Sequence, residues 1–165
     1  MDEWNRQIKL AQYMLLGTVI TTALNIAFLL GNVDMYINYC AALPYYLVWF
    51  GKIFDNGAYF GAINGEFTAT AMVLAGVLLA IWLVIWWLAR DRKLWLQIGF
   101  VAVLADLGLW ALLALGLFGD LLSFFWDLVL HVAVLWEMWQ GLKAWKRKDA
   151  IAAQQAKAEQ VAECV

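Results

Sequence analysis

The stretch FFWDLVLHVAVLWEMWQ, which runs from Phe124 to Gln140, combines a long apolar run with three ionisable side chains. Its tryptophan and aliphatic content is typical of a segment inside a membrane, yet it contains Asp127, His131 and Glu137. A charged side chain at the centre of a bilayer costs roughly 2.5–3.5 kcal/mol on insertion scales. These residues therefore need a polar environment inside a helical bundle, and they are the first candidates for a functional site.

The composition of the whole chain also indicates a membrane protein. Of its 165 residues, 65% are hydrophobic, the mean hydropathy is +0.73, and there are 11 tryptophans but only one proline. Soluble domains are about half apolar, so the lipid bilayer is the expected solvent. The net charge of −2 gives no reason to expect a nucleic-acid partner.

Four apolar stretches are long enough to cross a hydrocarbon core, which takes about 20 helical residues. They cover approximately residues 10–30, 67–89, 94–118 and 121–142. The sequence thus predicts an all-α polytopic membrane protein, a four-transmembrane-helix bundle formed by a single domain. The first stretch exceeds the apolar core of a cleaved signal peptide, which spans about 7–15 residues, so it is interpreted as a retained span.

The basic residues predict the orientation of these spans. All but one of the 11 Lys and Arg residues fall before the first span, between the second and third, or after the fourth, and the exception is Lys52. With an even number of spans, these groups lie on one side, which the positive-inside rule makes cytoplasmic. Both termini are then cytoplasmic, residues 33–66 form an external segment, and residues 143–165 form a cytoplasmic tail.

The external segment contains an apolar stretch, MYINYCAALPYYLVWFG (Met35–Gly51), that raises the question of a fifth span. A fifth span would place the basic cluster Arg90–Lys93 outside while the basic tail stayed inside, which the charge pattern opposes. Proline favours the first turn of a helix. An extra short helix from Pro44 to about Gly51 is therefore expected between the first two spans, either interfacial or re-entrant.

Polar side chains of three predicted spans fall at similar depths in the outer half of the bundle. Threonines and an asparagine share a face of the first span, one aspartate lies midway along the third, and an aspartate and a histidine lie one turn apart in the fourth. We expect them to converge on a solute or proton site. The candidate site residues are Asp106, Asp127, His131, Asn25, Thr21 and Thr22, with Tyr45, Tyr46 and Glu66 near its mouth or lid.

A structural explanation stands beside this functional one. Asp127 and His131 can neutralise each other, and threonines within spans often bond their own backbone carbonyls. Interhelical polar contacts also hold membrane bundles together. Glu137 lies off the polar stripe near the cytoplasmic boundary, whereas Asp106 has no polar neighbour in its own helix and needs a partner from another.

The sequence carries no motif of a known catalytic or cofactor site. A single histidine excludes bis-histidine haem ligation within one chain, and Cys40 and Cys164 form no CxxC pair. No GxSxG elbow, phosphate-binding loop or zinc-ligand spacing appears. No cofactor and no metal is therefore expected, and a non-enzymatic function is favoured.

Two stretches, ALPYYLVWFG (Ala42–Gly51) and FFWDLVLHVAVLWEMWQGLKAW (Phe124–Trp145), carry a family resemblance. They resemble a group of small, uncharacterised bacterial four-helix integral membrane proteins. The resemblance implies a bacterial plasma membrane and supplies no activity. The translocator-protein family has a similar length and tryptophan content, but its several prolines and five spans set it apart from this chain.

Three functions remain open. The first is a small membrane transporter or solute-binding membrane subunit whose polar intramembrane site opens to the external side. The second is a membrane-embedded enzyme using Asp127 and His131 as acid and base on a lipid or lipid-linked substrate. The third is a structural or regulatory membrane subunit. The expected partners are membrane lipids, a small-molecule solute or lipid ligand, and a second copy or a partner membrane subunit, because four helices are few for a transporter acting alone.

Overall fold

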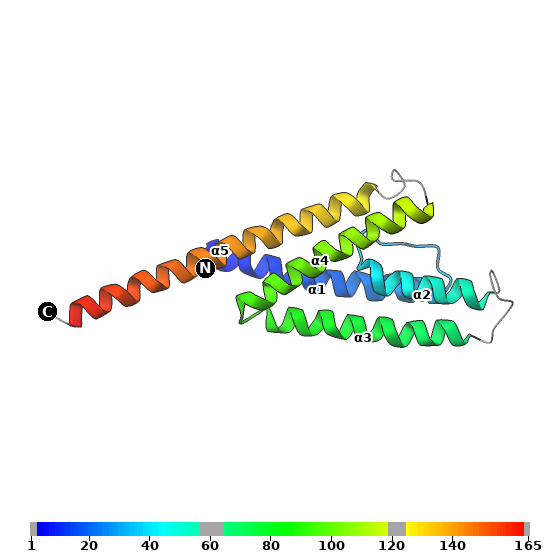
Figure 1. Cartoon of the computed structure of the whole chain (residues 1–165), viewed down its shortest axis with the longest axis horizontal. Helices are drawn as coiled ribbons and strands as arrows, with labels where there is room; N and C mark the ends of the chain where they lie inside the picture. The colour runs from blue at the N-terminus through cyan, green and yellow to red at the C-terminus, as the bar shows by residue number, and fades with distance from the viewer. Residues whose placement is uncertain (1–2, 57–64, 119–124, 164–165) are drawn as a thin grey trace.

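The computed structural model describes residues 3–56, 65–118 and 125–163, and all regular structure in these ranges is helical. The all-α prediction is therefore confirmed. In Figure 1 the helices run along one long axis, with α1 beside α5 and α2 beside α3. The elements in chain order are α1 (Glu3–Leu30), α2 (Ala42–Asp55), α3 (Glu66–Leu88), α4 (Lys93–Leu113), the π-helical turn η1 (Ala114–Phe118) and α5 (Phe125–Glu163).

Within the described residues, three helical segments are long and apolar enough to cross a membrane. They are Glu3–Leu30, Glu66–Leu88 and Lys93–Gly116, and they fit a multi-pass membrane protein. Large apolar side chains on these helices point outward, with exposed fractions of 67% for Val73 and 71% for Leu112. Such apolar surface suits contact with lipid. The first residues of the predicted span 121–142, and most of the loop before α3, lie outside the described residues.

The last helix is longer than the predicted span. α5 continues without a break to Glu163, so most of the predicted cytoplasmic tail belongs to the same helix. At 1.5 Å per residue, its 39 residues extend about 58 Å, and its C-terminal half projects beyond the start of α1 (Figure 1). The tail is rich in alanine, glutamine, lysine and glutamate, which favour helix. The side chains of α5 change from mostly apolar to mostly polar near Leu142, while the backbone stays helical on both sides of that residue.

The expected boundaries of the short helix, Pro44 to about Gly51, were too narrow. α2 runs from Ala42 to Asp55, and Gly51 lies inside it. A Cβ added at Gly51 would lie 3.0 Å from the Cβ of Ala71 and from the backbone of α3. Gly51 therefore permits close packing of α2 on α3 and does not end the helix.

Side chains from neighbouring helices satisfy several helix ends, which otherwise leave unpaired backbone groups. The ammonium of Lys52 donates to the carbonyl of Leu29 at 2.5 Å, near the C-terminus of α1. The buried amide of Gln12 donates to the carbonyl of Ala89 at 2.9 Å, at the C-terminus of α3. The contact with Leu29 gives Lys52, the one basic residue outside the predicted cytoplasmic groups, a structural role.

Candidate functional site

The linker between α1 and α2, residues 31–41, turns back along the bundle before α2 begins (Figure 1). Its last residues are buried, with exposed fractions of 8% for Tyr39, 2% for Cys40 and 1% for Ala41. Buried backbone N–H and C=O groups outside regular structure need hydrogen-bond partners. The polar side chains that the sequence places inside the bundle supply these partners.

α1 holds the first part of this linker. The side-chain amide of Asn25 both donates to the carbonyl of Ile37 and accepts its N–H, each at 2.8 Å. The hydroxyl of Thr22 accepts the N–H of Ala41 at 2.7 Å while donating to its own helix at 2.6 Å. The hydroxyl of Thr18 lies 2.5 Å from that of Tyr39. The polar face of α1 therefore recognises one particular linker conformation.

The two carboxylates hold the end of the linker and the start of α2. Asp127 accepts the N–H of Tyr39 at 2.6 Å. Asp106 accepts the first two N–H groups of α2, from Ala42 at 2.8 Å and from Leu43 at 3.3 Å. A carboxylate at a helix N-terminus is stabilised by the unpaired N–H groups and the helix dipole. Asp106 has no polar neighbour in its own helix and was expected to need a partner from another. The N-terminus of α2 is that partner.

Tyr39 has a backbone φ of 82°, in the left-handed region that residues other than glycine rarely adopt. This conformation costs on the order of 1–3 kcal/mol. Two contacts hold Tyr39 in this conformation: Asp127 accepts the hydrogen bond from its backbone N–H, and the hydroxyl of Thr18 contacts its phenol hydroxyl. The linker is thus held in a strained form by the same polar residues that line the interior.

His131 lies beside Asp106 in the interior of the bundle and is 1% exposed. Its Nδ1 is 2.8 Å from the backbone carbonyl oxygen of Asp127. A carbonyl only accepts, so Nδ1 carries a hydrogen, and in a neutral ring the other nitrogen is then an acceptor. That nitrogen, Nε2, faces Oδ2 of Asp106 at 3.5 Å and has no hydrogen-bond partner among the described residues. Two facing acceptors repel, so the arrangement is favourable when one proton lies between them.

The structure brings most of the predicted site residues together. Asp106, Asp127, Asn25 and Thr22 bind backbone groups of residues 37–43, and the ring of His131 packs against that of Tyr39 in the same segment. The common ligand of the first four is the backbone of the linker and of the start of α2, which no residue pattern in the sequence indicates. Tyr39, whose ring lies 4.9 Å from that of His131, was also missed.

The remaining predicted residues lie apart from this cluster. Thr21 donates to the carbonyls of Gly17 and Thr18 in its own helix, as the structural explanation expects. Tyr45 and Tyr46 pack edge to face at 5.4 Å on α2, and Glu66 is exposed in the first turn of α3. Glu137, already separated from the stripe in the sequence, lines with Thr21 a cavity of about 320 Å³ whose wall also includes Asn38 and Tyr39 of the linker.

The described contacts of the cluster are hydrogen bonds accepted from backbone N–H groups, together with one imidazole facing one carboxylate. Among the described residues, no group of three or more His, Cys, Asp or Glu side chains is placed to hold a metal ion. The side chains of Asp127 and His131 do not act as a simple pair, because the ring bonds the Asp127 backbone and faces Asp106.

Comparisons of the chain with protein-family models, with curated proteins and with solved structures give no match. Its function must therefore be inferred from the geometry of the cluster and from the surface of the helices.

Proposed function

We propose that the protein is a small membrane transporter or solute-binding membrane subunit that binds a proton between His131 and Asp106 and is closed by its own inserted linker. The observation that carries this proposal is the orientation of His131. Its Nδ1 is committed to the Asp127 carbonyl, and this directs Nε2 at the Asp106 carboxylate, 3.5 Å away, in a buried environment.

The proton site and the linker share one residue, and this couples them. Asp106 faces His131 with Oδ2, and the same oxygen accepts the N–H of Ala42. Loss of the shared proton leaves two acceptors opposed, so the Asp106 carboxylate and the imidazole repel each other, and a shift of Asp106 away from the ring moves the oxygen that holds Ala42. The other polar groups facing the imidazole, Asp127 and the hydroxyl-bearing ring of Tyr39, also bind or belong to the linker. Proton loss is thus expected to release the linker and open the polar interior.

The membrane topology that goes with this function has four spans, of which the first half of α5 is the fourth. In this proposal both termini are cytoplasmic, and α2 is a re-entrant or interfacial helix at the external side. The external side is then the one from which solute reaches the cluster. The loose sequence resemblance favours a bacterial plasma membrane, and a homodimer or a partner membrane subunit would complete the transport path.

The test is the pH dependence of thermal unfolding in detergent. The melting temperature of wild-type protein should vary with pH through the proton that bridges His131 and Asp106. His131→Gln and Asp106→Asn should flatten this dependence, while the control Glu159→Gln, an exposed acid in the tail of α5, should retain it. Proteoliposomes loaded with a pH-sensitive dye should then show proton movement for wild type that both cluster variants lose. If all four proteins respond alike to pH, the proton site is wrong.

A second candidate function is a structural or regulatory subunit without transport. It is favoured by a specific observation. Backbone N–H groups of the chain itself already occupy acceptor oxygens of four cluster residues, Asp106, Asp127, Asn25 and Thr22. Under this alternative the cluster variants lower the melting temperature by the same amount at every pH. The membrane-embedded enzyme is the least supported of the three proposals, because these same acceptors would have to be released before they could meet a substrate.

A further inference from the structure

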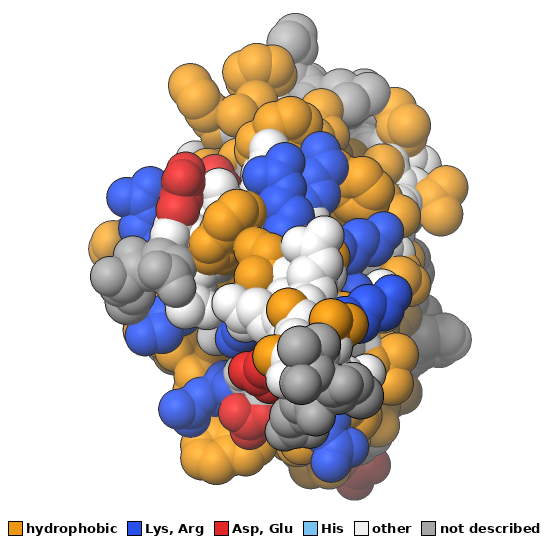
Figure 2. Space-filling model, turned by 90° about the vertical axis from the view of Figure 1, so that its left-hand side faces the viewer, with side chains coloured by type: hydrophobic (Ala, Val, Ile, Leu, Met, Phe, Trp, Pro, Cys, Tyr) orange, Lys and Arg blue, Asp and Glu red, His pale blue; other side chains and the backbone are white. Residues whose placement is uncertain are grey.

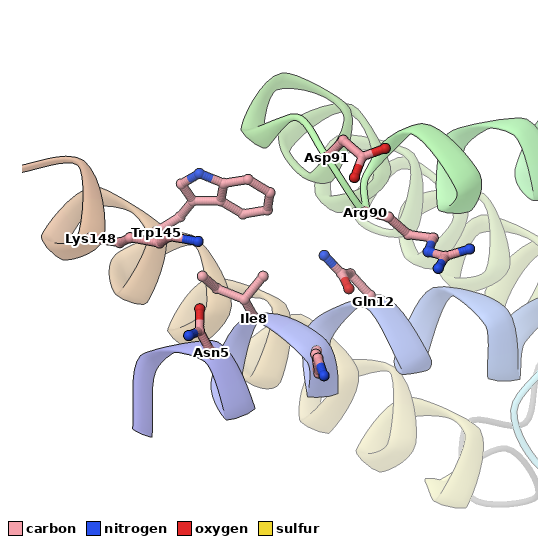
Figure 3. Close-up of a pocket in the computed structure, with 8 residues that line it drawn as sticks. Asn5, Ile8, Gln12, Arg90, Asp91, Trp145 and Lys148 are labelled. Carbon is pink, nitrogen blue, oxygen red and sulfur yellow. The ribbon is translucent and has the colours of Figure 1, made fainter. Parts of the chain in front are cut away.

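A cleft of about 400 Å³ lies at the opposite end of the bundle from the start of α3. It is formed by the beginning of α1, the turn between α3 and α4, and the part of α5 that leaves the bundle (Figure 3). Among the described residues that line it, Lys9, Arg90 and Lys148 are cationic, one from each of these three elements, and Asp91 is the one acidic side chain. The amide of Asn5 and the ring of Trp145 also line the cleft.

The charge of this end of the molecule is dominated by basic residues. Figure 2 shows Lys and Arg side chains distributed around the end of the bundle, with few acidic ones between them. Lys93 is already paired with Asp149 at 3.2 Å, so that acid is not available to neutralise the cleft. The described residues that line the cleft therefore carry a net positive charge, which favours an anionic ligand.

The position of the cleft along the helices indicates which class of anion it binds. α3 ends at Leu88 and α4 begins at Lys93, so the turn that carries Arg90 lies at the end of two candidate spans. The guanidinium of Arg90 lies 5.1 Å from the ring of Trp87, which is 59% exposed. Tryptophan and arginine together at the end of an apolar helix are typical of the headgroup region of a membrane.

We infer that this cleft binds the phosphate of an anionic phospholipid headgroup. Lysine and arginine donate charge-assisted hydrogen bonds to phosphate oxygens, and the carboxamide of Asn5 can donate to a headgroup hydroxyl. The acyl chains then lie against the exposed apolar surface of α3, which includes Val84 and Trp87. This inference does not depend on the proton site, which lies in a different part of the bundle.

The experiment compares lipid binding by native mass spectrometry and thermal unfolding in nanodiscs. Phosphatidylcholine nanodiscs with and without phosphatidylglycerol are compared, and inorganic phosphate is added to protein in neutral detergent. The test variant is Lys9→Gln with Lys148→Gln, both exposed side chains. The matched control is Lys146→Gln with Lys157→Gln, which removes the same charge from exposed positions outside the cleft.

Wild type and the control pair should retain phosphatidylglycerol in preference to phosphatidylcholine. The cleft pair should bind it roughly 30-fold more weakly, the loss expected for two basic residues at an anionic surface. Equal retention of both lipids by wild type would overturn the inference, as would an equal loss in the control pair. Stabilisation by inorganic phosphate that matches the lipid effect would assign the cleft to a soluble anion and would also overturn it.

Discussion

Asp106, in the middle of α4, caps the N-terminus of α2 through the backbone N–H of Ala42, at 2.8 Å. A mid-span carboxylate thereby meets the positive end of a helix dipole, which compensates part of the cost of placing it in the bundle. Asp106→Asn keeps the shape of the side chain but removes its charge. We expect the free energy of unfolding to fall by about 1–3 kcal/mol. Hydrogen exchange at Ala42 and Leu43 should quicken, whereas Asp34→Asn, in the exposed part of the linker, should leave both unchanged.

The two hydrogen bonds of Asn25 with Ile37 need one donor and one acceptor on the same side chain. Asn25→Asp preserves the acceptor but turns the donor into a second acceptor that faces the carbonyl of Ile37. We expect a loss of about 1–3 kcal/mol in the free energy of unfolding, measured by thermal or chemical denaturation in detergent. Asn38→Asp makes the same chemical change at an exposed linker position and should be nearly neutral. Equal effects of the two changes would contradict the role of Asn25.

Gly141 allows α5 to pack closely against α1. A Cβ added there would lie 2.5 Å from the Cβ of Ala11, so Gly141→Ala must push the helices apart. We expect a lower melting temperature, because overpacking typically costs about 1–3 kcal/mol. Gly108→Ala is the matched control, since a Cβ at Gly108 has no neighbour within 4 Å. It should raise stability by roughly 1 kcal/mol through helix propensity, so the two substitutions should have opposite signs.

Asp55 at the end of α2 accepts the N–H groups of Thr68 at 2.7 Å and Phe67 at 3.2 Å, in the first turn of α3. Partial desolvation acts to raise the pKa of Asp55, but these hydrogen bonds outweigh it and hold the pKa below its ordinary value. A lowered folded-state pKa contributes stability above the unfolded value, about 3.9, and that contribution is lost as the pH falls through the folded value. Acid unfolding monitored by helical circular dichroism should therefore be less steep in Asp55→Asn than in wild type. Identical acid profiles would contradict this assignment.

The proposed orientation is tested by thiol labelling of intact cells. A cysteine introduced at Asn56 should react with a membrane-impermeant maleimide, while Cys164 should react only after the cells are opened. Cys40 should stay unlabelled in both cases, because burial raises the pKa of its thiol to about 11 and only the thiolate reacts. Labelling of Cys164 alone in intact cells would reverse the orientation.

Much of the fold follows from local chemistry. Apolar runs of about 20 residues predict helices of membrane-crossing length, and the separate positions of Asp106, Asn25 and Asp127 predict a polar interior. Both predictions need only the period of the helix and the cost of exposing polar groups to lipid. The helix ends are less well predicted, and α5 shows why: its polarity changes near Leu142, but hydrogen bonding within the helix does not depend on the solvent outside it.

What the polar residues bind was decided only by the tertiary structure. Residues 31–41 have no regular structure whose hydrogen bonds can be anticipated, and their positions depend on packing among α1, α4 and α5 at once. The sequence places Asp127 and His131 one turn apart, which suggested a pair. In the fold, the Asp127 carboxylate bonds the N–H of Tyr39, and the imidazole faces Asp106. Sequence spacing determines which side chains share a helix face, whereas the partner across the interface is set by how the helices and the inserted linker pack together.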